Sequence, residues 1–341
     1  MTTSRPIARL PILILFPHNR CNCRCLMCDI WKEREAREIA AVEVARWTDE
    51  WRALGVREVV LTGGEPLMHS NLWGLCDLLK GSGFSITLLS SGLLLSRNAE
   101  EIARHVDSVI ASLDGPPEVH DAIRNVPRAF ERLALGVAAL RTARASLPVS
   151  ARCTVQKQNF RRIADTVAAA KETAFDRISF LAVDVSTDAF NRPGGIGLTP
   201  VPSLALTADE LPELERELAN LEQTCAADFA TGFIVESPAK LRLRLLAYFS
   251  ALCGLGPFPR NTCNAPWVSA VVESDGTVRP CFFHPPLGNL RQAGSLAAVL
   301  NAPGALAFRA GLDVATNPVC ARCVCSLQLR QDTGGNESQD S

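Results

Sequence analysis

Cysteine offers more chemistry than any other residue type in this sequence, which contains 13 of them. Cys21, Cys25 and Cys28 follow one another with the spacing Cys-x3-Cys-x2-Cys. Three thiolates in so short a loop can converge on one metal centre. Because iron–sulfur clusters are normally held by four thiolates, three would leave one iron of a [4Fe–4S] cube open to a substrate or cofactor. A zinc site or unligated thiols are the alternatives that this motif alone leaves open.

A second motif, Gly63-Gly64-Glu65-Pro66, directly follows a β-rich run. Two glycines allow a backbone to approach a ligand closely, and their carbonyl oxygens can accept hydrogen bonds from an ammonium group. Glu65 would add negative charge beside that ammonium. A plain strand-to-helix turn is the alternative explanation of the two glycines.

Together, the two motifs resemble the radical S-adenosylmethionine (SAM) superfamily. The resemblance implies that Cys21, Cys25 and Cys28 bind a [4Fe–4S] cluster whose fourth iron is chelated by the amino and carboxylate groups of SAM. A reduced cluster would transfer one electron to SAM and release a 5′-deoxyadenosyl radical, which removes a hydrogen atom from a substrate C–H bond. The cofactor supplies this chemistry, while the protein must orient SAM and exclude water.

Further segments resemble the SAM-binding positions of the branch that carries an auxiliary-cluster domain. Ser112-Leu113-Asp114-Gly115 with Arg124 resembles its fourth-strand motif, whose serine and arginine contact SAM. Ser90-Ser91-Gly92 stands where relatives commonly have Thr-Asn-Gly near the ribose, and Met27 stands where they often have an aromatic residue. Val183 suits an apolar adenine wall, and core packing explains it equally well. The cofactor-binding residues expected from these matches are Met27, Gly63, Gly64, Glu65, Pro66, Ser91, Ser112, Arg124, Arg152 and Val183.

A second group of cysteines lies near the C-terminal end of the chain. The pattern Cys263-x12-Gly276-x4-Cys281 precedes Cys320-x2-Cys323, and a hairpin with a tight turn at Gly276 would bring the first two thiols together. This pattern resembles the auxiliary iron–sulfur domain SPASM and its shortened form, twitch, and implies one further [4Fe–4S] cluster. A structural zinc site is the alternative, because four thiolates suit zinc as well. The ligands that the resemblance implies are Cys263, Cys281, Cys320 and Cys323, with Cys325 as a spare or substitute.

A cluster with four protein ligands cannot bind substrate directly and is suited to accepting an electron. We therefore expect the reaction to be an oxidation. We expect its substrate to be a small polar molecule such as a sugar or aminocyclitol, because 20 residues precede Cys21 and peptide-modifying relatives often carry a longer N-terminal extension. Epimerisation with Cys253 as hydrogen donor, and cross-link or thioether formation on a precursor peptide, remain alternatives. From another class, a non-catalytic iron–sulfur or zinc protein also remains. An external reductant such as flavodoxin or ferredoxin is expected, and Asp184, Asp188 and Arg192 are expected to contact a polar substrate.

The remaining candidates have ordinary explanations. Cys76 lies in an apolar helical pattern and Cys153 in a β-rich run, so both are expected to be buried small hydrophobes. The five histidines form no metal-binding pair. His120 and His284 are expected to be structural residues that form hydrogen bonds.

Alternating β-rich and helical runs predict the elements that position these residues. Six strand-then-helix units imply parallel strands with crossover helices, hence an α/β barrel or a doubly wound sheet, whose carboxyl edge would carry the chemistry. The resemblance favours the barrel, as a partial (β/α)6 barrel. The expected strands are Pro11–Phe16, Glu58–Thr62, Ile86–Ser91, Asp107–Leu113, Val149–Val155 and Arg177–Val183, and the expected helices are Ala40–Leu54, Asn71–Leu79, Ala99–His105, Ala129–Thr142 and Ile163–Thr173.

Composition and length narrow the classes of protein to which this chain can belong. The chain has 341 residues, 47% of them hydrophobic, and a net charge of −1, so disorder and binding of nucleic acid through bulk charge are disfavoured. No apolar run approaches the roughly 20 residues that a membrane helix needs, and we expect a cytoplasmic protein. The expected division is a radical SAM barrel at 8–206, a helical linker at 207–262, an auxiliary-cluster domain at 263–330 that is a small α+β unit, and a tail at 331–341.

Overall fold

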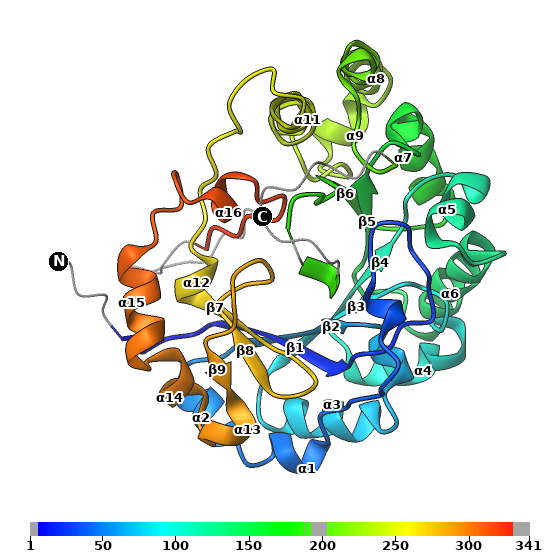
Figure 1. Ribbon diagram of the computed structural model, residues 1–341. Coiled ribbons are helices and arrows are strands. Elements are labelled where there is room, and N and C mark those ends of the chain that lie inside the picture. The colour runs from blue at the N-terminus through cyan, green and yellow to red at the C-terminus, as the bar shows by residue number, and fades with distance from the viewer. Residues whose placement is uncertain (1–5, 188, 192–202, 330–341) are drawn as a thin grey trace.

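The computed structural model describes residues 6–187, 189–191 and 203–329. Its centre is a nine-stranded sheet in the order β6-β5-β4-β3-β2-β1-β7-β8-β9. Strands β1 to β6 pair in parallel with their neighbours, and Figure 1 shows a curved sheet with helices along its outer side. This arrangement confirms the expected partial (β/α)6 barrel. The strands are β1 Ile12–His18, β2 Glu58–Gly63, β3 Ser85–Ser90, β4 Ser108–Ser112, β5 Val149–Val155 and β6 Arg177–Ala182.

Alternation along the strands gives the barrel two different faces. In β5, Val149, Ala151 and Val155 are fully buried, whereas Arg152 between them is partly accessible. Arg152 lies in register with Ser112 of β4 and, on the other side, with Ser179 of β6. Side chains of one parity therefore pack under the helices, and those of the other parity line the concave side, where a ligand can reach them.

The helices follow the strands nearly as predicted, with two differences. The expected helix Ala40–Leu54 is two short helices separated by a turn. Helix α5 was not predicted, because it begins at the second of two prolines and buries polar His120 and Arg124 along with Ile123. The helices of the barrel are α1 Ala41–Val44, α2 Thr48–Ala53, α3 Leu72–Gly81, α4 Ala99–His105, α5 Pro117–Arg124, α6 Ala129–Ala143 and α7 Ile163–Glu172.

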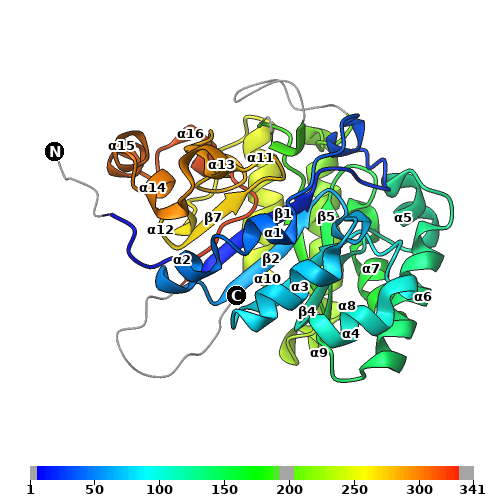
Figure 2. The same ribbon diagram turned by 90° about the horizontal axis from the view of Figure 1, so that it is seen from below.

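The C-terminal segment extends the barrel sheet instead of forming a separate one. Strand β7 (Ser269–Val272) pairs in parallel with β1, and β8 (Thr277–Arg279) returns antiparallel to it, as the hairpin prediction required. Gly276 forms the turn with φ +86. Seen from below, the C-terminal helices lie at one end of the sheet and α5, α6 and α7 at the other (Figure 2). The remaining elements there are β9 Gly288–Asn289, α12 Ala265–Val268, α13 Leu290–Ala293, α14 Leu296–Leu300, α15 Pro303–Gly311 and α16 Pro318–Ala321.

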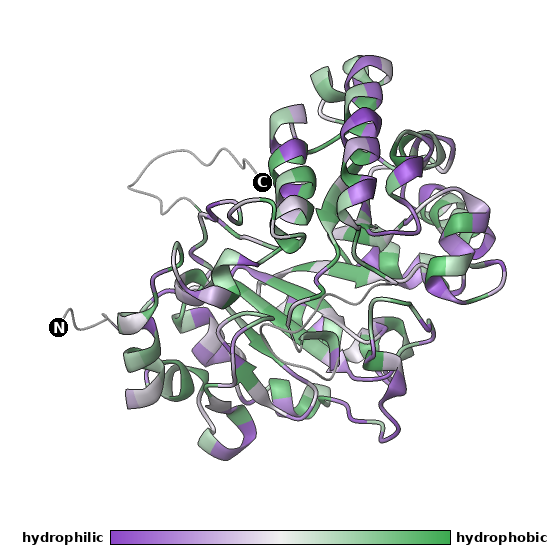
Figure 3. Cartoon of the chain, turned by 45° about the horizontal axis from the view of Figure 1, so that its top comes forward, coloured by the Kyte–Doolittle hydropathy of each residue, from purple (hydrophilic) through white to green (hydrophobic). Residues whose placement is uncertain are grey.

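A helical segment connects the barrel to the C-terminal hairpin. It begins where Thr207 and Glu210 form a capping box. Tyr248 anchors it by donating to the Val183 carbonyl oxygen over 3.2 Å. None of the described helices is long and apolar enough to cross a membrane. Figure 3 shows hydrophobic residues along the strands, while the surrounding helices carry both hydrophobic and hydrophilic residues. The helices of this connecting segment are α8 Leu211–Thr224, α9 Ala226–Ala230, α10 Pro238–Leu241, a π-helical turn Arg242–Ala247 and α11 Tyr248–Leu252.

Candidate active site

The loop Cys21–Cys28 leaves the carboxyl end of β1 and is fixed to the neighbouring helix α5. The N–H of Arg24 donates to the Arg124 carbonyl oxygen and that of Leu26 to the Ile123 carbonyl oxygen, both over 3.0 Å. These bonds direct Cys23 and Cys25 inward, where both are nearly inaccessible, while the side chains of Arg24 and Leu26 stay exposed. The sequence motif is thus held as one rigid loop at the expected edge of the sheet.

The thiols of this loop have perturbed acidities. A hydrogen bond from Cys23 and the nearby Arg124 guanidinium lower the pKa of Cys25, which favours the thiolate needed by a metal. Burial raises the pKa of Cys28 to about 12, and the charges of Cys25 and Cys21 act in the same direction. Thiolate charges in this loop would repel one another, and a cation placed among them would relieve that repulsion.

Both glycines of the Gly63-Gly64 pair are required by packing within the protein. Gly63 has φ +103, and a Cβ there would lie 2.7 Å from the ring of Phe16. A Cβ on Gly64 would overlap the carbonyl oxygen of Arg20, which accepts a hydrogen bond of 2.8 Å from the N–H of Glu65. The motif therefore presses the end of β2 against the start of the cysteine loop, a role that its sequence alone did not reveal.

Glu65 is completely buried and joins the ends of β2 and β3. Its carboxylate accepts from the Ser91 N–H over 2.8 Å, from the Ser91 hydroxyl over 2.6 Å and from the Ser90 hydroxyl over 3.0 Å. Burial raises its pKa, and the hydrogen bonds from Ser91 act in the opposite direction. Ser91, expected beside the ribose, here bonds to Glu65, and its hydroxyl also lies 3.1 Å from Asn22 Oδ1.

A buried ion pair connects the cysteine loop to residues at the carboxyl ends of β4 and β5. Arg124 pairs with Asp114, which is fully buried and accepts from the Thr154 N–H over 2.9 Å. The other end of the guanidinium donates to Cys25 Sγ over 3.5 Å. Burial opposes the charge of Arg124, but Asp114 and Cys25 together raise its pKa. Arg124 is thus a fixed cation directly beside a candidate metal ligand.

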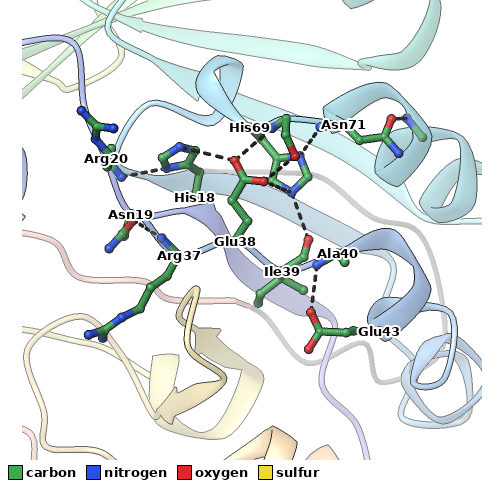
Figure 4. A network of polar contacts seen from close by, with 12 residues as sticks. His18, Asn19, Arg20, Arg37, Glu38, Ile39, Ala40, Glu43, His69 and Asn71 are labelled. Atoms are coloured by element: carbon green, nitrogen blue, oxygen red, sulfur yellow. Dashed lines mark hydrogen bonds and ion pairs between the residues drawn. The ribbon is translucent and has the colours of Figure 1, made fainter. Parts of the chain in front are cut away.

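Two histidines that the sequence analysis did not single out brace the site from outside. Figure 4 shows His18 and His69 on either side of Glu38. His18 Nδ1 accepts from the Arg20 N–H over 2.8 Å, while its Nε2 lies 3.5 Å from Glu38. The Ser70 N–H donates to the Glu38 carboxylate over 3.0 Å. This network ties the start of the cysteine loop to the segment after the Gly-Gly-Glu-Pro motif, and isolated histidines gave no sequence signal for it.

The C-terminal cysteines converge from three segments. Asn261, two residues before Cys263, donates to the carbonyl oxygens of Cys320 over 2.7 Å and Cys323 over 3.0 Å. Burial raises the pKa of Cys281 to about 11, and the Cys263 and Cys325 thiols add to this shift. Within the described ranges, no three His, Cys, Asp or Glu side chains are grouped as a single metal ion requires. A [4Fe–4S] cube spaces its ligands more widely than one ion does.

Comparison with known proteins assigns the family. A model of the radical SAM superfamily matches residues 15–170, and a model of the SPASM iron–sulfur cluster-binding domain matches residues 263–324. The chain belongs to the radical SAM superfamily. The two matches also indicate SAM and [4Fe–4S] clusters as its cofactors, including an auxiliary cluster. The recognised family is thus the one that the cysteine spacings resemble.

Named relatives of this radical SAM chain differ in what they act on. The AdoMet-dependent heme synthase of Methanosarcina barkeri is 32% identical over 45% of this chain, and the match covers 44% of that protein. The PqqA peptide cyclase of Ruegeria pomeroyi is 27% identical over 82% of this chain and 69% of its own length. Among solved structures, anSMEcpe with bound AdoMet has a TM-score of 0.66 at 18% identity over 90% of this chain and 80% of that one, which shows a shared fold.

The radical SAM site has buried polar atoms that the protein itself leaves without hydrogen-bond partners. In the described part of the chain these include Arg124 Nε, His120 Nε2 and Gln156 Oε1. Gln156 is fully buried, and its amide nitrogen lies 3.8 Å from the sulfur of Met27 in the cysteine loop. Such atoms are costly unless a ligand satisfies them. They fit a polar cofactor seated between the cysteine loop and the ends of β4 and β5, and Gln156 carried no motif by which the sequence could have identified it.

Other expected residues lie as follows. Cys76 and Cys153 are buried, which confirms their structural assignment. Cys253 directly follows α11, and its thiol donates to the Leu206 carbonyl oxygen over 3.4 Å. Asp184 accepts from the Ser186 N–H over 3.1 Å and from the Thr187 hydroxyl, so it shapes its own turn. Asp188 and Arg192 lie outside the described residues.

Proposed function

We propose that this radical SAM chain oxidises a C–H position of its substrate and passes the released electron to the auxiliary cluster. When bound, the reduced cluster and SAM supply the radical that removes the hydrogen atom. The substrate then loses one electron and one proton, so that the overall change is an oxidation. Cys21, Cys25 and Cys28 are the proposed ligands of the first cluster, and the proposed ligands of the auxiliary cluster are Cys263, Cys281, Cys320 and Cys323.

One observation carries the electron-acceptor role. Phe16, on the strand that leads into the cysteine loop, stacks on Phe282 with ring centroids 6.0 Å apart. Phe282 directly follows Cys281, a proposed auxiliary ligand. The two cluster sites are therefore joined through a direct aromatic contact and through the pairing of β1 with β7. A substrate held between them would lie near both the radical source and an electron acceptor.

For the substrate, we propose a side chain of a peptide. The support is the match to PqqA peptide cyclase, which extends across both the barrel and the auxiliary domain. A shallow, open depression of about 480 Å³ beside the cysteine loop is lined by residues of both charges, which suits the polar backbone and side chains of a peptide. The residues that line it are Asp29, Lys32, Glu33, Arg34 and Asn191. The sugar or aminocyclitol expected from the sequence stays a prediction, as does the external one-electron donor.

The deciding experiment uses a deuterated cell extract, separated into a peptide fraction and a fraction of small polar molecules. Anaerobically reconstituted protein is incubated with SAM, dithionite and each fraction, and deuterium in the 5′-deoxyadenosine is measured by mass spectrometry. We expect transfer from the peptide fraction. Transfer from the small molecules alone would contradict the peptide proposal. Wild-type product that persists in a Cys281→Ser/Cys320→Ser variant would contradict the electron-acceptor role.

A further inference from the structure

His284 contacts ligand candidates from two separate segments of the auxiliary site. It lies three residues after Cys281, and its side chain is almost completely buried. Its Nε2 is 3.2 Å from Cys320 Sγ. Its main-chain N–H is one of two that bond to the Cys281 thiol, the other belonging to Phe283. One residue thus joins the hairpin half of the site to the half on α16.

The orientation of this imidazole is fixed. The ring packs against Phe308 of α15, with centroids 4.9 Å apart and planes inclined by 67°. Arg279 Nη1 donates to the His284 carbonyl oxygen over 3.2 Å and holds the backbone. Because the ring is already ordered, its Nε2 contacts Cys320 without a further loss of side-chain conformational entropy.

The chemistry of the contact fixes its direction. Cys320 would bind iron as a thiolate, which is a hydrogen-bond acceptor and has no proton to give. The ring nitrogen facing it must then be the donor, so His284 carries a proton on Nε2. A hydrogen bond to a ligating sulfur withdraws electron density from the cluster and stabilises its reduced form.

We propose that His284 is a positioning residue that donates an N–H···S hydrogen bond to Cys320 and raises the reduction potential of the auxiliary cluster. This inference rests on the proposed function, because a higher potential makes the cluster a better acceptor for the electron of the substrate radical. Main-chain donors are also present, such as the Cys325 N–H, which lies 3.4 Å from Cys323 Sγ. These main-chain donors remain when a side chain is replaced, so the effect of the His284 ring on the reduction potential can be measured separately.

The test compares His284→Phe, which keeps a flat ring without the donor, with His284→Gln, which keeps an N–H donor. His105→Phe, on helix α4 of the barrel, is the matched control. Each variant is loaded anaerobically, its iron is counted, and both clusters are titrated electrochemically with EPR detection. The SAM-binding cluster of the same molecule serves as an internal reference.

We expect His284→Phe to lower the ratio of reduced to oxidised auxiliary cluster about tenfold at a fixed potential, a shift of roughly 59 mV for one electron. His284→Gln should shift it less, and His105→Phe not at all. An unshifted auxiliary potential in a fully loaded His284→Phe variant would overturn the inference. Loss of auxiliary iron in both His284 variants would also overturn it, since the residue would then be needed for assembly. Wild-type protein with iron for one cluster would instead refute the proposed two-cluster function.

Discussion

The ring of Phe16 is in contact with Phe282 on one side and with the backbone of Gly63 on another. A barrel residue thus touches both the Gly-Gly-Glu-Pro motif and the segment that contains Cys281. Because close-packed interiors transmit displacements, the geometry of the SAM site and that of the auxiliary site cannot change independently. The two sites are expected to behave as one mechanical unit.

Gly64 gives the most direct test of the packing at the cysteine loop. Gly64→Ala places a methyl group on the Arg20 carbonyl oxygen, and backbone cannot move aside as a flexible side chain can. We expect a loss of roughly 1–3 kcal/mol of unfolding free energy and incomplete loading of the first cluster. Gly81→Ala is the control, because no atom beyond its chain neighbours and its own helix backbone lies within 4 Å of a Cβ at that position. Urea unfolding and iron counts measure both effects, and equal behaviour of the two variants would refute the explanation.

The Arg124–Asp114 pair predicts a non-additive pair of substitutions. Arg124→Gln leaves a buried carboxylate without its counter-ion and should cost about 3–5 kcal/mol. Asp114→Asn leaves the opposite charge and should cost a similar amount. The double variant should be more stable than the sum of the two costs predicts, because neither charge remains. A double-mutant cycle from urea unfolding gives the coupling, and simple additivity would contradict it.

His18 predicts acid sensitivity. Burial lowers its pKa below the ordinary value of 6.5, so the unfolded chain takes up a proton before the folded chain does. The unfolding free energy should therefore be highest above pH 6.5 and fall as the pH drops below it. His18→Gln should reduce the difference between unfolding midpoints measured at pH 8 and pH 5.5. A variant with the wild-type difference would show that another group is responsible.

Cys323 and Cys325 compete for the last auxiliary ligand position. Cys325 is exposed and its N–H points to the sulfur of Cys323, as expected of a main-chain group that donates a hydrogen bond to a ligating sulfur. We expect Cys323→Ser to lose about half of the bound iron and Cys325→Ser to retain it. The reverse result in iron analysis would exchange the two assignments.

A substitution of Cys253 distinguishes oxidation from epimerisation. Its thiol is bonded to the Leu206 carbonyl oxygen, and burial raises its pKa, so it is held as a protonated thiol. If the reaction is an oxidation, Cys253→Ala should keep the wild-type rate of product formation. Abolished turnover, together with deuterium from D2O in the wild-type product, would support epimerisation.

The sequence predicted the barrel well because its strands are encoded locally. Alternating or continuous apolar runs placed all six strands to within about two residues, and the cysteine spacings pointed to the family. Helix α5 was missed because two of its three buried residues are polar. Arg124 pairs with the Asp114 carboxylate, and His120 Nδ1 accepts from the Asp114 N–H. His284 forms a hydrogen bond, as expected, but its partner was not predicted. A single histidine has no periodicity, and its meaning depends on Cys320, which lies 36 residues away.

Local sequence patterns also could not predict the pairing of β7 with β1, because it joins Leu13 to Ala270, which lie far apart in the sequence. Its consequence concerns synthesis of the chain. Strand β1 has a hydrophobic edge that remains unpaired until residue 272 has left the ribosome, when most of the protein has already been made. An open edge of this kind can pair with other chains, and slow long-range pairing prolongs the exposure. A version shortened before residue 263 would retain that edge permanently, so aggregation, and not an independent soluble barrel, is the expected fate of the truncated protein.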